Sequence, residues 1–230
     1  MIRKVPFVLA FFAVLSSAAF GLYERKSYTD YTHRSDLLNL IQVAELSEEI
    51  AKENAAVMIE DLPNSGIIVR VTATGEYIPR FQAGQQSAIV QKVYQGDKVS
   101  VGQEIYITTT RWNYIFKASS VDTNEDKRVI AQMGFVNRME AGKDYLVFLD
   151  HKMETLDNDD STFQLADEYL IAPIFSYDTH ENVTIEIPEG QPTYVDYSDV
   201  KDNEFFACTK KALEYMLGIK YEMLTLYPLS

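Results

Sequence analysis

The sequence predicts a mainly β, α+β fold in which an antiparallel β-barrel, or a strongly curved sheet, is flanked by helices. Three extended runs carry this prediction, because β-branched and aromatic residues dominate them: 67–74, 87–94 and 103–110. Gly75 and Gly96 follow the first two runs, and glycine accepts the positive φ that tight turns require. We therefore expect a three-strand meander.

A fourth run, Tyr145–Leu149, is apolar at every position. A strand without alternation is covered on both faces, so this run should occupy a central place in a closed or sandwiched sheet. The last expected strands lie in Tyr169–Tyr177 and Asn182–Ile187, while Trp112–Phe116 is either a strand or an aromatic bend. We expect residues 66–187 to build the barrel.

One helix is expected before the barrel in the sequence, and another after it. Residues 35–62 carry apolar side chains at helical spacing, with Ser35 and Asp36 as candidate caps. A second helix, Thr209–Leu224, should pack against the outside of the barrel, with Lys220 on its solvent side. The apolar stripe expected for this helix comprises Leu213, Leu217, Tyr221 and Leu224.

The N-terminal residues predict export. Arg3 and Lys4 precede 18 residues without a charge, Val5–Leu22, which form either a cleaved signal peptide or a membrane anchor. Cleavage would fall near Ala19. Basic residues before an apolar run predict that everything after it lies outside the cytoplasm. The expected organisation is a signal or anchor (1–22), a linker (23–34), a helical segment (35–62) and a barrel domain (63–230).

The net charge argues against nucleic-acid partners, and the cysteine content excludes an intramolecular disulfide. The chain has 21 basic and 34 acidic residues, a formal charge of −13, and such a surface repels phosphate backbones. We therefore expect no nucleic-acid partner. Cys208 is the single cysteine, so no intramolecular disulfide can form. Its expected role is that of a small, half-buried apolar residue near a helix start, with a nucleophile as the alternative.

No catalytic constellation is visible in the sequence. The histidines at 33, 151 and 180 have no spacing typical of metal ligands or of a catalytic pair. The sequence also has no glycine-rich phosphate loop and no serine elbow. We therefore expect no enzyme activity and no cofactor.

One acidic stretch is a weak candidate for a calcium loop. Asp157, Asp159, Ser161 and Glu168 place oxygen donors at positions 1, 3, 5 and 12, as in a helix–loop–helix calcium site. Position 6 is Thr162 instead of glycine. A solvated acidic loop is the expected interpretation, and calcium binding is the alternative.

Several short sequence segments resemble those of a known group of proteins. They are Ile67–Gly75, Val93–Asp97, Val101–Ile105, Glu140–Leu149 and Val200–Phe206. Together they resemble uncharacterised exported or membrane-anchored proteins of Gram-positive bacteria, whose sheet is similar to the OB-type barrel of the netrin and tissue-inhibitor-of-metalloproteinase class. The resemblance implies an OB-like barrel. Inhibition in that class depends on a disulfide-bonded N-terminal cysteine that reaches a catalytic zinc, and this chain has no cysteine before the barrel.

These observations favour a non-enzymatic, exported or membrane-anchored binding module that faces the outside of the cell. Its partner is expected to be a protein or a cell-envelope component, with the membrane contacted through the N-terminal segment. A protease-inhibitor-like protein, by analogy of fold, and a calcium-binding surface protein are the alternatives. An enzyme is a further hypothesis, for which the sequence supplies no catalytic group.

Overall fold

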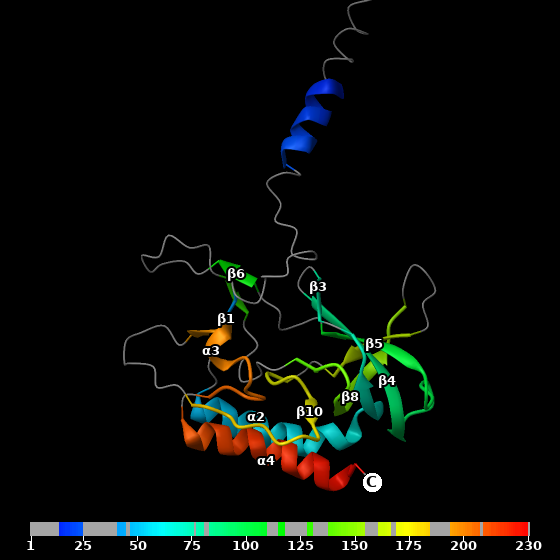
Figure 1. The fold of residues 1–230 in the computed structure, drawn as a ribbon, viewed down its shortest axis with the longest axis vertical. Coiled ribbons are helices and arrows are strands. Elements are labelled where there is room, and N and C mark those ends of the chain that lie inside the picture. Colours follow the sequence, from blue (N-terminus) through cyan, green and yellow to red (C-terminus); the bar gives the residue numbers. More distant parts are fainter. Residues whose placement is uncertain are drawn as a thin grey trace, which may run out of the picture. The chain divides into compact units, whose positions relative to one another are not determined.

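The structure is a computed structural model of the chain (Figure 1). It describes residues 14–24, 41–44, 47–75, 77–80, 83–109, 115–117, 128–130, 138–154, 161–166, 169–184, 194–207 and 209–229. The chain divides into two units, Met1–Arg34 and Ser35–Ser230. In the first unit, residues 14–24 are helical and mostly exposed. Among the described residues, no helix combines the length and the apolar character needed to cross a membrane.

Within the described residues of the second unit, five strands close into a barrel. They are β2 (Ile67–Ala73), β4 (Ala83–Gln95), β5 (Glu104–Thr109), β8 (Asp144–Lys152) and β9 (Thr162–Leu165). Their order is β8-β2-β4-β5-β9, and β9 pairs back onto β8. The β5–β9 pair is parallel, whereas every other pair in the ring is antiparallel. The predicted OB-like barrel and its three-strand meander are confirmed, with β5–β9 as the exception to the antiparallel expectation.

Two shorter strands extend the barrel. β3 (Ile78–Arg80) forms a hairpin with the start of β4, and β10 (Ile174–Ser176) pairs with β8. β4 is long and shows two register shifts against β2, next to Val69 and Val71. Such bulges bend a strand, which allows β4 to pair with β2 along one half and with β5 along the other.

The predicted central strand is covered on both faces. All five residues from Tyr145 to Leu149 are buried. Val147 and Leu149 point into the barrel, whose interior also contains Val69, Val90, Ile105, Ile107, Phe163 and Leu165. Leu146 and Phe148 alternate with them and join a second cluster outside the barrel.

Two helices form that outer cluster. α2 (Glu48–Asp61) runs into a short 3-10 turn, η3 (Leu62–Asn64), and α4 (Lys210–Leu226) lies beside it (Figure 1). Both helices cover the outer face of β2, β8 and β10. The predicted packing of the last helix against the barrel is therefore confirmed. Thr209 caps α4, because its hydroxyl oxygen accepts a hydrogen bond from Ala212 N at 3.1 Å.

The helix predicted over 35–62 is shorter than expected. It begins at Glu48 behind the cap Ser47, and Ile41–Ala44 instead form a strand, β1. β1 belongs to a second sheet, whose strand order is β11-β1-β7-β6. The other strands of this sheet are β6 (Ile115–Lys117), β7 (Arg128–Ile130) and β11 (Tyr194–Asp196), and the short helix α3 (Tyr197–Val200) follows β11 directly. The β-branched residues Ile41 and Val43 suit a strand, and pairing with distant segments overrides the local helical spacing.

The strand predicted at Asn182–Ile187 is not present in its described part. Residues 182–184 are irregular, and 185–187 lie outside the described residues. Side chains take the place of a partner strand here. Asn203 Nδ2 donates to Val183 O at 2.7 Å, and Val183 N donates to Asn203 Oδ1 at 3.0 Å. Of the run Tyr169–Tyr177, Ile174–Ser176 is a strand.

The apolar stripe of α4 lies about one position away from the predicted one. Its buried residues are Ala212, Met216, Ile219, Lys220 and Met223, and Tyr221 is 60% exposed. Lys220 was expected on the solvent side, but it is 4% exposed. The leucine spacing at 213, 217 and 224 fitted a helix, yet these residues flank the buried stripe and are partly buried.

Candidate functional site

The outer face of β4, β5 and β9 is the candidate ligand-binding surface. Side chains of a barrel strand alternate between interior and exterior. On β4, Ala88 and Val90 belong to the interior cluster, so the residues that alternate with them face outward. We call six partly or fully exposed outward residues of the three strands the open face: Ser87, Ile89, Gln91, Glu104, Tyr106 and Gln164. Thr108 and Thr162 lie on the same side of the strands but are buried.

Strand pairing makes the open face continuous. Ser87 lies opposite Tyr106, and Ile89 lies opposite Glu104. Tyr106 in turn lies opposite Thr162 of β9, one strand further. Ile89 and Tyr106 are half-buried, whereas Gln91 and Glu104 are exposed. The face therefore presents amide and hydroxyl groups around one aromatic ring and one aliphatic side chain.

The helices leave this face uncovered. The buried strand residues of the helical cluster are Ile68, Leu146, Phe148 and Phe175, from β2, β8 and β10. Tyr94 at the end of β4 packs against the cluster, which includes none of the open-face residues. Figure 1 shows α2 and α4 layered together along one side of the barrel. Glu104 is the single formally charged residue among the six of the open face.

Two connections bracket the open face. β2 and β8 run antiparallel, with Ile67 opposite Leu149 and Thr72 opposite Asp144. The β2–β4 connection therefore leaves one end of the barrel, and the β8–β9 connection leaves the other. The first is tied to β4, because Gln86 Nε2 donates to Gly75 O at 3.1 Å. In OB folds, the second and third strands and these two connections form the usual ligand surface.

The calcium candidates lie in and after the β8–β9 connection. Asp157, Asp159 and Glu168 lie outside the described residues. Ser161 is half-buried, and its carbonyl oxygen accepts a hydrogen bond from Tyr106 N at 2.8 Å. The next four residues form β9, so positions 6–9 of the candidate loop are a barrel strand. Among the described residues, no group of three or more His, Cys, Asp and Glu is placed to hold a metal ion.

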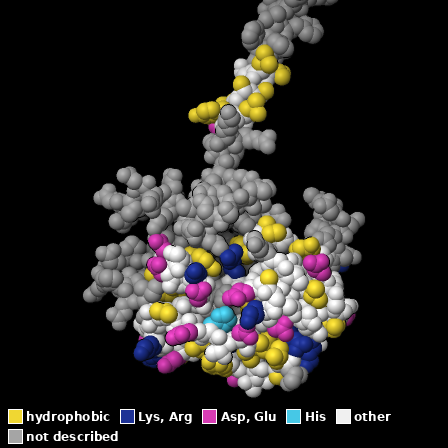
Figure 2. Space-filling view, in the orientation of Figure 1, with side chains coloured by type: hydrophobic (Ala, Val, Ile, Leu, Met, Phe, Trp, Pro, Cys, Tyr) yellow, Lys and Arg dark blue, Asp and Glu magenta, His cyan; other side chains and the backbone are white. Residues whose placement is uncertain are grey.

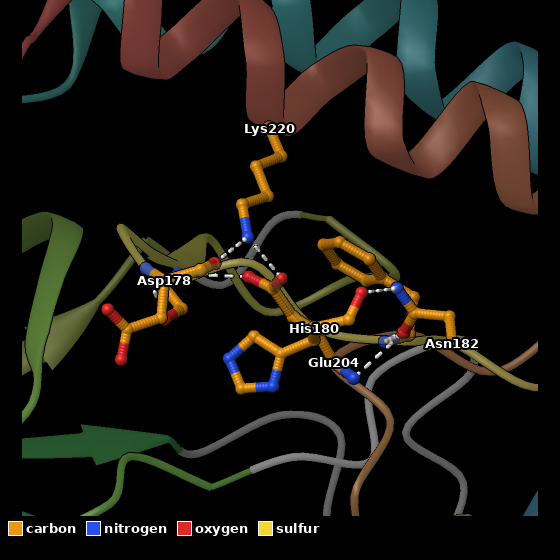
Figure 3. A network of polar contacts seen from close by, with 7 residues as sticks. Asp178, His180, Asn182, Glu204 and Lys220 are labelled. Atoms are coloured by element: carbon orange, nitrogen blue, oxygen red, sulfur yellow. Dashed lines mark hydrogen bonds and ion pairs between the residues drawn. The ribbon is translucent and has the colours of Figure 1, made fainter.

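A second polar cluster lies between α4 and the barrel (Figure 3). The ammonium group of Lys220 contacts Glu204 Oε2 and donates to the backbone oxygen of Asp178 at 2.9 Å. The other carboxylate oxygen of Glu204 accepts from Ser176 N at 2.9 Å. Asn182 Oδ1 accepts from the backbone nitrogens of Glu204 and Phe205, both at 2.9 Å. These bonds tie three chain segments together.

The rim of this cluster carries an exposed ion pair. Lys143 Nζ lies 2.7 Å from Asp178 Oδ2, and both side chains are about half exposed. The hydrogen bond from Lys143 lowers the pKa of Asp178, and the same bond raises the pKa of Lys143. His180 belongs to the cluster, and Figure 3 shows its ring turned away from Lys220. The view in Figure 2 shows acidic and basic side chains interspersed around a histidine. We interpret the cluster as a structural connection.

The other residues considered from the sequence are dispersed. His151 lies at the end of β8, where its Nδ1 is 2.7 Å from Asp150 Oδ2, and both side chains are exposed. His33 and Cys208 lie outside the described residues. Sequence reasoning missed the buried pair of Lys220 with Glu204. The spacing of Lys220 from Met216 and Met223 was the available signal, because it places the lysine on the buried side of α4.

Comparison with protein-family models and with curated proteins gives no match for this chain.

Proposed function

We propose that the protein is a non-enzymatic binding module that works outside the cytoplasm, and that its open face engages a protein or a component of the cell envelope. The observation that carries the proposal is that, among the described residues, helices cover one side of the barrel and not the other. Within the described part of the chain, helices occupy the outer face of β2, β8 and β10, whereas they do not cover the outer face of β4, β5 and β9, which lies between two connections. Ligands of OB-like barrels bind at this position.

The chemistry of the open face favours a partner recognised by hydrogen bonds and ring contacts. Gln91 and Gln164 can both donate and accept, Ser87 adds a hydroxyl, and Tyr106 offers a ring beside Ile89. A phosphate polymer would meet Glu104 and a chain of net charge −13. We therefore expect an uncharged or cationic surface on the partner.

The N-terminal sequence supports the proposed location. The run of uncharged residues after Lys4 predicts export, and the described residues of the barrel unit form core clusters of their own. A unit with its own core can fold after its leader or anchor has been inserted or removed. In this proposal residues 5–22 hold the module at the membrane or direct its secretion.

Site-specific photo-crosslinking tests the proposal. A photoreactive residue at Gln91 would report on the open face, and one at Glu222, exposed on α4, is the matched control. Irradiation of intact cells that produce the full chain should give a discrete adduct from position 91 and not from position 222. Tyr106→Ala in the same chain should weaken the adduct. Equal labelling from both positions, or none from 91, would contradict the proposed use of this face.

A further inference from the structure

The segment after α4 is held against the barrel by hydrogen bonds from side chains to its backbone. α4 ends at Leu226, and Tyr227 leaves the helical conformation with φ −126° and ψ 71°. Proline at 228 disfavours a helical conformation for the residue before it. The carbonyl groups of the next two residues are then bound by side chains of the barrel, while their own side chains stay exposed. We call Tyr227–Leu229 the strap.

Side chains from three different places bind three consecutive carbonyl groups of the strap. Tyr177, directly after β10, donates its hydroxyl to Tyr227 O at 2.8 Å. Tyr94 of β4 donates to Pro228 O, and Arg70 of β2 donates through Nη1 to Leu229 O. The two tyrosine hydroxyl oxygens lie 3.2 Å apart. All three bonds go to the backbone, so they would accept any extended segment.

One side chain of the strap adds an anchor. The ring of Tyr227 makes edge contacts with Tyr94, at a centroid distance of 5.2 Å, and with Phe148, at 5.8 Å. Such edge-to-face pairs add to the stabilisation that burial gives. Burial also raises the pKa of Tyr227. Pro228 and Leu229 are exposed and stand outside the core clusters. The surface therefore binds an aromatic side chain together with its own carbonyl group and the two that follow.

The surface has a further hydrogen-bond donor. Nε of Arg70 is buried and has no hydrogen-bond partner among the described residues, and Asp144 Oδ2 lies 4.0 Å from it. A buried donor without a partner is uncommon, because it loses its water without replacing it. The strap thus does not use all the binding capacity of the guanidinium.

We propose that Arg70, Tyr94, Phe148 and Tyr177 form a peptide-binding surface, that the strap occupies it within the same chain, and that its external ligand is an extended peptide with an aromatic residue followed by proline. Side-chain donors aimed at successive backbone carbonyls are suited to a peptide in extended form. This surface lies on the helix-covered side and is distinct from the open face. A segment joined directly to α4 has a local concentration in roughly the millimolar range, so an external peptide must displace it.

The test measures binding of an acetylated, amidated peptide with the sequence of residues 225–230, labelled at its N-terminus, to variants of the full chain. Pro228→Gly loosens the strap without touching the core, and Tyr227→Ala empties the ring site. We expect both variants to bind the peptide about ten-fold more tightly than the unaltered chain does. Leu226→Ala, an exposed neighbour, is the matched control and should resemble the unaltered chain.

Two further measurements decide the outcome. Adding Tyr94→Phe or Arg70→Gln to Pro228→Gly should remove the gain, and a peptide with alanine in place of its tyrosine should not bind. If Pro228→Gly melts normally and yet binds no better than the Leu226→Ala control, the strap is only a helix cap and the proposal fails. A gain that survives Arg70→Gln and Tyr94→Phe together would place the peptide elsewhere and would also overturn it.

Discussion

Lys220 on α4 and Glu204 before α4 form an ion pair inside the layer between the helices and the barrel, with side chains 5% and 3% exposed (Figure 3). Charged groups this far from water are costly unless every polar atom is bonded. Here the lysine also bonds Asp178 O, and the carboxylate also bonds Ser176 N. The pair fixes the position of α4 along the barrel, since a slip of the helix would leave both charges without partners.

Removing one member of this pair should therefore be costly. We expect Lys220→Met to reduce the free energy of unfolding by about 3–5 kcal/mol, because the carboxylate of Glu204 stays buried without its counter-charge. Urea denaturation monitored by circular dichroism measures the change. In a double-mutant cycle with Glu204→Gln, the combined loss should be smaller than the sum of the single losses. Strictly additive losses would contradict the coupling. Lys210→Met, at an exposed position, is the control.

The parts of the fold that could be predicted are those in which local pattern and burial agree. The run Tyr145–Leu149 indicated a strand covered on both faces, and the structure confirms it. The short strands β1 and β9 were missed, because four residues gain strand structure only through partners far away in the sequence. Lys220 was misplaced because a charged residue on a helix suggests solvent, although its buried neighbours Met216 and Met223 share its side.

The open face could not be predicted from the sequence, for a different reason. Alternation along β4 does separate Ser87 and Ile89 from Ala88 and Val90, so the two faces of the strand can be assigned. Which face the helices cover depends on the order of strands in the barrel, and that order includes the parallel β5–β9 pair. No local pattern encodes such a pairing.

Shortening a side chain inside the barrel should strongly lower the stability of the fold. Leu149 is 0% exposed and belongs to the interior cluster. We expect Leu149→Ala to cost about 2–5 kcal/mol, from lost transfer free energy plus the cavity left behind. Thermal and urea unfolding measure the loss. Val101→Ala, at a residue 66% exposed, should change stability by less than about 0.5 kcal/mol. Similar losses at both positions would contradict the assignment of Leu149 to the core.

Calcium should have little effect on stability if the β8–β9 connection is a solvated acidic loop. A site with a dissociation constant of about 10 µM would add about 2.7 kcal/mol at roughly 1 mM calcium, which is a shift of several degrees in Tm. We expect no such shift between calcium and chelator. A clear rise in Tm that Asp157→Asn and Asp159→Asn abolish would establish the calcium-binding alternative, and Asp97→Asn is a control outside the loop.

Export can be tested with a reporter that is active only in the cytoplasm, fused after Ser230. The fusion to the full chain should give no signal, because residues 5–22 are expected to direct everything after them across the membrane. The same reporter fused to residues 35–230 should give a signal, since this version lacks the apolar run. Activity of the full-length fusion equal to that of the shortened one would refute export.

Alkaline pH should destabilise the barrel through Tyr145. Burial raises the pKa of this phenol from 10.0 to about 12, and its oxygen accepts a hydrogen bond from Glu140 N at 2.8 Å. Between these two pKa values the unfolded chain releases the proton while the folded chain keeps it. Stability therefore falls as pH rises from about 10 to 12, by roughly 2–3 kcal/mol for two pKa units.

Tyr145→Phe should remove that part of the pH dependence. Tyr177 contributes in the same direction, because burial also raises its pKa, so Tyr145→Phe leaves a residual slope that adding Tyr177→Phe reduces further. Unfolding free energies from urea titrations at pH 8, 10 and about 12 measure the effect. Tyr221→Phe, at a residue 60% exposed, is the control and should keep the slope of the unaltered chain. An unchanged slope in Tyr145→Phe would show that this phenol ionises equally well in the folded chain, and it would contradict the burial of Tyr145 in the barrel core.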